Sequence, residues 1–440
     1  MITTEPIIHV GILSSKKIEF IFHGFFVTAE GEKYSGKQKA EWKNGKIFFD
    51  GKTSDELFFQ PIDESNTFDL LDVVIGIHFH WERKENQRFK GSLRIIIEKD
   101  QLTAINDIKA EDYLVSVISS EMSATSSLEL LKAHAVISRS WLFYPLQNDK
   151  KNFFSQNSVE NDTENRHIKW YERGEHEHFD VCADDHCQRY QGITRATSET
   201  VQLAIEVTRG EVLMFDHQIC DTRFSKCCGG VTETFENCWA PINHPYLESI
   251  VDNSLPPQGF DLDLAIESNA QKWIRECPPA FCNTQDKKVL SQVLNNYDQE
   301  TIDFYRWKVI YTQEEISEII YHRSGFDFGK ILDLIPLKRG KSGRIVELKI
   351  VGSKQTMIVG KELEIRKWLS TSHLYSSAFV VDKENFRQQI PGRFILTGAG
   401  WGHGVGLCQI GAAMMSEKDY PYDRILLHYF RETELRKIYE

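Results

Sequence analysis

The chain has 440 residues, of which 41% are hydrophobic and 26% are charged, and its formal net charge is -12. A chain of this length divides into two or three domains as a rule, because a single core stops growing beyond about 250–300 residues. The acidic balance excludes a general binder of nucleic acid or of anionic membranes, since those partners require a basic surface.

The N-terminus carries no recognisable signal peptide. The opening MITTEPIIHVGILSS lacks a basic and an apolar region, and the apolar run at 16–27 starts late and contains Glu19 and His23. No apolar run reaches the roughly 18–20 residues that a membrane-spanning helix needs. The protein is therefore either cytoplasmic or a mature form whose signal has been removed, and the residues alone leave both open.

The first half of the chain changes from strand-like to helical patterns. Residues 7–100 form short β-rich runs broken by Gly, Asn and Asp, as in an all-β region. The run SLELLKAHAVISRSWLFY at 127–144 has apolar residues at helical spacing, and we expect Pro145 to end this helix. A polar, histidine-rich stretch at 150–190 then interrupts regular structure.

The second half alternates in the same way. Helical patterns return from about 259 to 330, residues 331–411 are again β-rich, and DRILLHYFRETELRKIY closes the chain with helical spacing. Among the nine cysteines, Cys277 and Cys282 lie close enough to form a disulfide in a small loop, whereas an intracellular chain would keep both thiols free.

One short segment is rich in potential metal ligands. HEHFDVCADDHC places five such residues within twelve positions, namely His176, His178, Cys182, His186 and Cys187. Thiolate and imidazole are the ligands of tetrahedral zinc sites. The spacing matches no common zinc finger, so the residues alone favour a metal site and a loop of solvated histidines equally.

Glu121 is a candidate acid in the stretch SVISSEMSA, between an apolar run and a helix. A carboxylic acid among apolar neighbours can have a raised pKa and donate a proton near neutrality. A glutamate before a helix is more often a solvated charge or one that complements the helix dipole. Taken alone, the stretch favours this structural interpretation.

The stretch GAGWGHGVGLCQIGA at 398–412 has glycine at every second position from Gly398 to Gly406. A dinucleotide-binding loop is excluded, because His403 stands where the third glycine belongs and too few residues follow. A period of two predicts a strand with a bare face of glycines and with Trp401 and His403 opposite. A face without side chains allows either a ligand or another backbone to lie close to the strand. The spacing of the glycines does not distinguish these two alternatives.

Three motifs together resemble the SpoIID/LytB family, the stage II sporulation protein D and amidase-enhancer proteins of bacterial cell-wall remodelling. They stand in the family's order, and the resemblance covers about residue 90 to the end. The motifs are EDYLVSVISSEMSATSSLELLKAHAVISRSW (111–141), DVCADDHCQRYQGI (180–193) and GAGWGHGVGLCQIGAAMM (398–415).

The resemblance implies an α+β fold that is β-rich, with a few helices and a helical insertion. We expect four parts. They are an N-terminal β-rich region (1–90), a SpoIID-like core with Glu121 and the Cys/His loop (91–258), a helical insertion (259–330), and a C-terminal β-rich part of the core with the glycine-rich motif (331–440).

Several family members are peptidoglycan lytic transglycosylases, which cleave the MurNAc–GlcNAc bond and leave a 1,6-anhydro-MurNAc end. The resemblance assigns Glu121 the role of acid and then base. One carboxylate suffices, because the C6 hydroxyl of the sugar replaces the second carboxylate or water of ordinary glycosidases. Other members enhance a cell-wall amidase, so the implied partners are glycan strands and such an amidase, with no nucleic acid, and the implied location is extracytoplasmic.

The resemblance also implies a bound zinc ion. Its ligands are His176, Cys182, His186 and Cys187, with His178 as a substitute. Four protein ligands leave no position for water, so this zinc is structural.

Substrate contacts are expected from the glycine-rich motif and from the helix after Glu121. Lactyl carboxylates of stripped glycan need a cationic partner, and Arg139 is the candidate, although an arginine on a helix is more often a structural ion-pair partner. In the family, Gln is common at the position of His134 and Ser at that of Cys408. The expected substrate-binding residues are Arg139, Trp401, Gly402, His403, Gly404 and Gln409.

Three functions therefore remain to be separated. The first is a lytic transglycosylase that uses Glu121. The second is a non-catalytic wall-binding module that activates an amidase. The third is a zinc hydrolase acting on peptide stems, which requires an open position on the metal.

Overall fold

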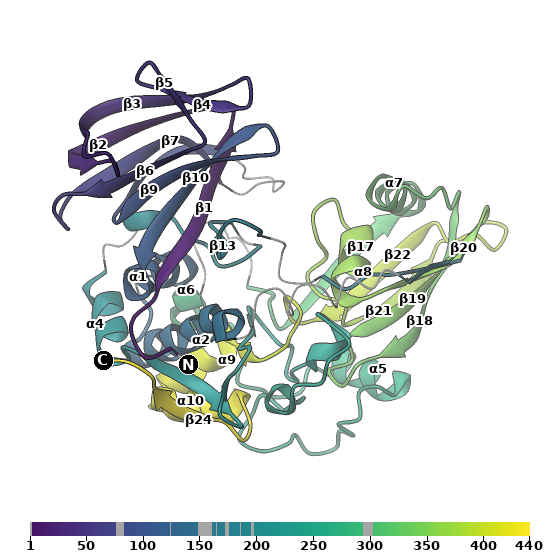
Figure 1. The fold of residues 1–440 in the computed structure, drawn as a ribbon. Helices are drawn as coiled ribbons and strands as arrows, with labels where there is room; N and C mark the ends of the chain where they lie inside the picture. Colours follow the sequence, from purple (N-terminus) through teal and green to yellow (C-terminus); the bar gives the residue numbers. More distant parts are fainter. Residues whose placement is uncertain are drawn as a thin grey trace.

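The computed structural model describes residues 2–75, 83–123, 125–147, 161–163, 165–171, 176–184, 186–194, 198–293 and 302–440. These residues form several sheets and helices, which confirms the expected β-rich α+β fold (Figure 1). Much of the histidine-rich stretch at 150–190 lies outside the described residues. None of the described helices has the length and apolarity needed to cross a membrane.

The N-terminal residues form the predicted β region, shown in purple and blue in Figure 1. Strands β2 and β7 alternate buried and more exposed side chains, and phenylalanines such as Phe20, Phe26 and Phe59 fill the interior. The strands of this 11-stranded sheet are β1 (Ile7–Ser15), β2 (Lys17–Val27), β3 (Lys33–Lys43), β4 (Lys46–Phe49), β5 (Lys52–Ser54), β6 (Glu56–Pro61), β7 (Thr67–Ile75), β8 (Arg83–Phe89), β9 (Ser92–Glu98), β10 (Gln101–Lys109) and β13 (Val181–Cys182).

Strand β10 connects this sheet to a helical core. It pairs with β1 and β9, is buried along nearly its whole length, and leads directly into α1 (Ala110–Glu121). The apolar residues of β10 and α1 therefore hold the helix against the sheet, and the end of α1 is fixed in space.

Helix α2 (Leu128–Gln147) lies at the centre of the helical core and is almost completely buried from Leu130 to Phe143. It continues to Gln147, so the expected end at Pro145 is wrong; a proline this close to the C-terminus disturbs only the last turn. The other helices here are α4 (Glu199–Val207), α6 (Lys287–Val293), α9 (Gln409–Glu417) and α10 (Tyr422–Tyr429).

The C-terminus departs from the helical prediction. After α10, residues of β24 (Glu434–Lys437) pair antiparallel with β14 (Glu211–Phe215), whose other neighbour is β15 (Gln218–Ile219). The helical spacing is thus correct only as far as Tyr429. Pairing with a strand more than two hundred residues away decides the rest.

A second lobe, green in Figure 1, carries its own core around Trp307, Trp368 and Phe394. Its sheets contain β11 (Asn161–Thr163), β12 (Arg166–Ile168), β17 (Arg306–Thr312), β18 (Ile331–Arg339), β19 (Ile345–Gly352), β20 (Thr356–Gly360), β21 (Phe379–Glu384) and β22 (Arg393–Ala399), and its helices are α5 (Glu267–Glu276), α7 (Gln313–Ser324) and α8 (Glu362–Trp368). The remaining short elements are β16 (Phe224–Ser225), β23 (Leu407–Cys408) and the 3-10 helices η1 (Gly192–Thr194), η2 (Phe235–Asn237) and η3 (Pro245–Leu247).

The range 259–330 contains the helices α5, α6 and α7 that its periodicity predicts. It also contains strand β17, which pairs with β22 from Arg306↔Ala399 to Thr312↔Arg393 and which the sequence patterns did not indicate. Ahead of this strand, α6 packs against α9 of the helical core. The range therefore contributes to both lobes.

Candidate functional site

Glu121 is the last residue of α1 and is half-buried. The helix stops here because Met122 turns to an extended conformation, while its N–H still donates to the Ile118 carbonyl at 2.9 Å. The next turn is held by α6: Ser123 N–H and Ser126 Oγ both donate to the Gln292 carbonyl, at 3.1 and 2.6 Å. The position of Glu121 is thus set from both sides.

The segment after the Cys/His loop runs along α1 and contacts Glu121 directly. The backbone N–H of Arg189 donates to Glu121 Oε1 at 3.2 Å, and that of Gln191 donates to Ser116 Oγ at 3.1 Å. Between them, the Tyr190 ring stacks on Tyr113 with centroids 5.1 Å apart. The metal-binding candidate and the candidate acid are therefore parts of one local arrangement.

The glycine-rich motif reaches the same place through its last residues. Gln409 begins α9, is buried, and its Nε2 lies 3.8 Å from the Met122 sulfur. The three motifs are far apart in the chain, yet they meet around the end of α1. Gln409 is held inside the protein by this contact rather than projecting into solvent.

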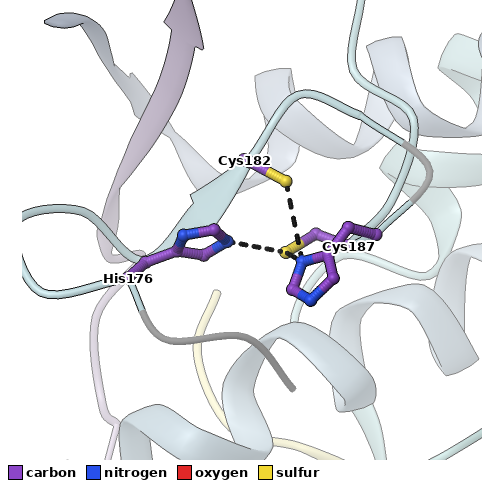
Figure 2. Close-up of side chains that lie close together, drawn as sticks. His176, Cys182 and Cys187 are labelled. Carbon is purple, nitrogen blue, oxygen red and sulfur yellow. Dashed lines mark hydrogen bonds between the residues drawn. The ribbon is translucent and has the colours of Figure 1, made fainter. Parts of the chain in front are cut away.

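The four predicted zinc ligands converge (Figure 2). One ligand atom from each of His176, Cys182, His186 and Cys187 lies within 4.8 Å of all the others. The fifth candidate, His178, is outside this group, with its exposed imidazole 4.0 Å from Glu177.

The distances within this group fit a tetrahedral ion. Cys187 Sγ is 3.4 Å from His176 Nε2 and 3.6 Å from His186 Nδ1, and Cys182 Sγ is 3.9 Å from His186 Nδ1. Zn–S bonds of about 2.3 Å and Zn–N bonds of about 2.05 Å give a tetrahedron whose S···N edges are about 3.6 Å. The residues present therefore suit zinc in number, type and spacing.

The loop around these ligands is anchored to the N-terminal sheet. Strand β13, which contains Cys182, pairs in parallel with β1 at Val10 and Gly11. The His176 ring stacks on Phe179 with centroids 4.5 Å apart. Hydrogen bonding from Cys187 and from the two imidazoles lowers the pKa of the Cys182 thiol, which favours the thiolate form that binds metals.

The glycine-rich motif does not form the predicted strand. Strand β22 ends at Ala399, and Gly400, Gly402, Gly404 and Gly406 have φ angles of 75, 94, 78 and 72°. Alternate left-handed residues turn the chain repeatedly, which an extended strand does not allow. The prediction of a flat strand with one bare face is therefore wrong for residues 400–406.

The space at these glycines is filled by the protein itself. A Cβ at Gly404 would lie 2.4 Å from the Arg344 guanidinium, and one at Gly406 would lie 2.1 Å from the Arg223 carbonyl oxygen. Arg344 is buried and donates to the Gly402 carbonyl at 3.0 Å and to the Cys228 carbonyl at 3.1 Å. Of the two alternatives for the glycines, close approach of another part of the chain holds here. No local signal in the sequence identifies Arg344 as the partner.

Trp401 and His403 also have internal roles. The half-buried Trp401 ring packs between Tyr375 and Phe304, at 4.3 and 4.8 Å between centroids. His403 Nδ1 accepts from the Val405 N–H at 3.0 Å, and the ring also forms a backbone hydrogen bond with Phe224. Burial and nearby arginines hold the pKa of His403 well below its ordinary value, so the ring is neutral at physiological pH. These bonds hold the ring of His403 within the protein, and its expected role in binding a sugar stays a prediction.

Arg139 is not placed to bind a substrate, and this expectation is wrong. Its side chain is fully buried and forms two hydrogen bonds with the Glu111 carboxylate, at 3.0 and 2.7 Å, and a third with the Glu211 carbonyl at 3.0 Å. Arg139 is instead a structural ion-pair partner of Glu111, which was the alternative interpretation of an arginine on a helix.

His134 and Cys408, where the family commonly has Gln and Ser, are both buried. All nine cysteines are within the described residues and none forms a disulfide, so Cys277 and Cys282 are free thiols. His134 is buried, and burial lowers its pKa to about 3. Its ring packs edge-on against Phe224, with centroids 5.1 Å apart.

Comparison with known proteins matches both halves of the chain. The family model for stage II sporulation protein (SpoIID) matches residues 98–215, and a domain of unknown function (DUF8618) matches residues 233–406. An uncharacterized protein of Brachyspira hyodysenteriae is 26% identical over 347 residues, which cover 79% of this chain and 72% of that protein.

Two relatives have informative names. Stage II sporulation protein D of Bacillus subtilis is 20% identical over 336 residues, covering 76% of each chain. The amidase enhancer of Bacillus subtilis is 24% identical over 247 residues, which cover 53% of this chain but 32% of that protein. The SpoIID match contains α1 with Glu121, α2 and the Cys/His loop. The SpoIID match and the similarity to these two proteins support the membership in the SpoIID/LytB family that the three motifs predict.

Proposed function

We propose that the protein is a peptidoglycan lytic transglycosylase that acts outside the cytoplasm and cleaves MurNAc–GlcNAc bonds of glycan strands. The observation that carries this proposal is the placement of Glu121. It is a half-buried carboxyl group at the end of α1, in the segment that matches SpoIID, with a backbone N–H donor at 3.2 Å. The product is a glycan strand ending in 1,6-anhydro-MurNAc.

One carboxyl group can perform both proton transfers of this reaction. Glu121 gives its proton to the glycosidic oxygen, the bond between that oxygen and C1 breaks, and the released GlcNAc carries the proton as a hydroxyl. The MurNAc C6 hydroxyl then bonds to C1 and returns its proton to Glu121, so no water is consumed. The Arg189 N–H stabilises the carboxylate while it is charged.

We propose that the Cys/His group holds a structural zinc ion. His176, Cys182, His186 and Cys187 fill a tetrahedral shell and leave no position for water, so bound zinc would supply rigidity instead of a nucleophile. The loop it closes continues through Arg189 to Glu121. Removing the ion should therefore reduce activity by loosening the position of the acid.

A second candidate function is enhancement of a cell-wall amidase without sugar cleavage. It is supported by the similarity to the amidase enhancer of Bacillus subtilis, although that similarity spans about a third of the relative. In this case the same surface binds glycan strands, and the partner is the amidase. The zinc-hydrolase alternative has weaker support, because the four convergent ligands close the coordination shell.

Mass spectrometry of products released from purified glycan strands tests the proposal. The wild-type protein should release anhydro-MurNAc fragments, and Glu121→Gln should lower their rate by at least about 100-fold, the lower end of general acid–base contributions. Glu199→Gln, an exposed residue at the start of α4, is the matched control and should leave the rate unchanged. Full activity of the Glu121→Gln variant would refute the mechanism.

The second candidate gives a different pattern in the same experiment. The wild-type protein would release no sugar product but would raise the rate of a purified cell-wall amidase on intact peptidoglycan. The Glu121→Gln variant would then stimulate the amidase as well as the wild type does. Sugar release that depends on Glu121 excludes this candidate as the sole function.

A further inference from the structure

A second group of potential metal ligands lies in the interior, separate from the Cys/His loop. Cys228, Asp252, Cys282 and Cys408 are all buried, and one ligand atom from each lies within 4.8 Å of all the others. They come from four distant segments: the loop after β16, the segment after η3, the loop between α5 and α6, and the end of β23. We propose that these residues bind a second metal ion of the zinc class, with three thiolates and one carboxylate as ligands.

The spacing of the sulfur atoms fits a single ion. Cys228 Sγ and Cys282 Sγ are 3.6 Å apart, whereas the S···S edge of a zinc–thiolate tetrahedron with bonds of about 2.3 Å is about 3.8 Å. A disulfide requires about 2.05 Å, and the two thiols are free. Three thiolates and a carboxylate around one centre favour a d¹⁰ ion such as zinc over hard cations, which prefer oxygen alone.

The group has the outer hydrogen bonds that orient metal ligands. The Cys228 N–H donates to Cys408 Sγ at 3.2 Å, and the Gly230 N–H donates to Cys228 Sγ at 3.4 Å. Asp252 Oδ1 accepts from Tyr429 Oη at 2.6 Å, and its Oδ2 accepts from the Cys282 N–H at 2.9 Å. Each carboxylate oxygen keeps a further lone pair for a metal. Such second contacts fix ligand orientation in known sites.

A cation would also balance the buried acid. Asp252 is completely buried. In the described part of the chain, the basic group paired with it is His428, whose Nε2 is 3.9 Å away. An isolated buried charge is costly, and a bound metal ion removes that cost.

The position of the group gives the ion a structural role close to the candidate active site. Cys408 immediately precedes Gln409, the residue of α9 that contacts Met122 beside Glu121. The ion would join four segments spread over 180 residues of sequence, from Cys228 to Cys408. It would hold the glycine-rich motif in the conformation that delivers Gln409 to this contact.

Metal analysis of the purified full-length protein and its variants tests the inference. The wild type should contain two zinc ions per chain. Cys187→Ala should lose the ion of the Cys/His loop, Cys228→Ala should lose the other, and the double variant should lose both. Cys220→Ala, a buried cysteine outside both groups, should retain two.

Three results would overturn the inference. The first is one zinc per wild-type chain that disappears completely in the Cys187→Ala variant. The second is iron with acid-labile sulfide in place of zinc. The third is a Cys228–Cys282 disulfide found by mass spectrometry of unreduced peptides. None of these results depends on whether glycan is cleaved.

Cobalt spectroscopy covers the case in which Cys228→Ala fails to fold. Co²⁺ loaded into the folded Cys187→Ala protein should give the intense visible bands of a tetrahedral site and a near-ultraviolet thiolate-to-cobalt band. Cys227→Ala, which removes the neighbouring cysteine but no proposed ligand, should preserve these bands. Their absence from the Cys187→Ala protein would refute a second site, and their loss on Cys227→Ala would refute Asp252 as the fourth ligand.

Discussion

Replacing Arg139 should damage the fold and not substrate recognition. The residue lies on α2 with no exposed side-chain surface, and its partner Glu111 on α1 is 7% exposed. Arg139→Ala leaves a buried carboxylate without its cation, although Glu111 still accepts from the Gly210 N–H at 3.2 Å and from Tyr439 Oη. The loss is therefore that of a buried ion pair broken on one side.

The expected magnitude follows from the burial of the pair. Breaking a buried ion pair by removing one partner costs about 3–5 kcal/mol. Arg275 provides the control, because it also forms two hydrogen bonds with a carboxylate, that of Asp382, but both side chains are more than 40% exposed. Arg275→Ala should cost at most about 1 kcal/mol, since exposed ion pairs contribute little.

Hydrogen exchange in α1 and β14 is the suitable measurement, because unfolding of a chain with several cores is not a two-state process. Each 1.4 kcal/mol changes an exchange rate about tenfold, so Arg139→Ala should accelerate the protected amides by about 10²–10⁴. Arg275→Ala should change the same amides by less than about tenfold.

Unchanged protection in the Arg139→Ala protein would contradict a structural role for this ion pair. Unchanged protection together with loss of affinity for stripped glycan, but not for intact glycan, would restore a direct role in binding the lactyl carboxylates. The structure predicts the opposite, because the Arg139 side chain has no exposed surface and is held by three internal hydrogen bonds.

Two further predictions concern stability. Gly404→Ala should destabilise the protein by more than the roughly 1–2 kcal/mol of a left-handed alanine backbone, because the added Cβ would also displace the Arg344 guanidinium. Gly31 is the control, since it has a similar φ of +86° and no atom within 4 Å of an added Cβ. In thermal unfolding, Gly31→Ala should lose only the free energy of the left-handed backbone. The neighbouring Arg139 lowers the pKa of Glu111 in the folded protein against the opposing effect of burial. The stability from this pair is therefore present above the ordinary glutamate pKa of about 4.3 and is lost as the pH falls through the folded value, which urea unfolding between pH 3 and 6 will measure.

Each of these predictions has a contradicting result. Equal losses for Gly404→Ala and Gly31→Ala would show that Arg344 adapts without cost. An Arg139→Met protein that retains the full acid-induced loss of stability would show that the ion pair is not its source.

The Cys/His site was accessible to sequence reasoning because its ligands lie within twelve residues. Short separation makes convergence inexpensive in chain entropy, so residue type and spacing are informative. The buried group at Cys228, Asp252, Cys282 and Cys408 gave no such signal. Its members come from segments up to 180 residues apart and meet only in the packed core, and a sequence shows no period over such distances.

The sequence by itself indicated the resemblance to the SpoIID/LytB family, the β-rich α+β class, the segment of Glu121 and the four Cys/His residues that converge. The residue types within short motifs and the order of the three motifs indicate the family and the site, and apolar periodicity indicates the main helices and strands. The tertiary structure alone decided the roles of Arg139 and of the glycine-rich motif. The spacing of residues along a helix does not show which arginine becomes buried, because that depends on what packs against the helix. Glycine adopts either sign of φ, so the spacing of glycines does not distinguish a strand from a series of left-handed turns.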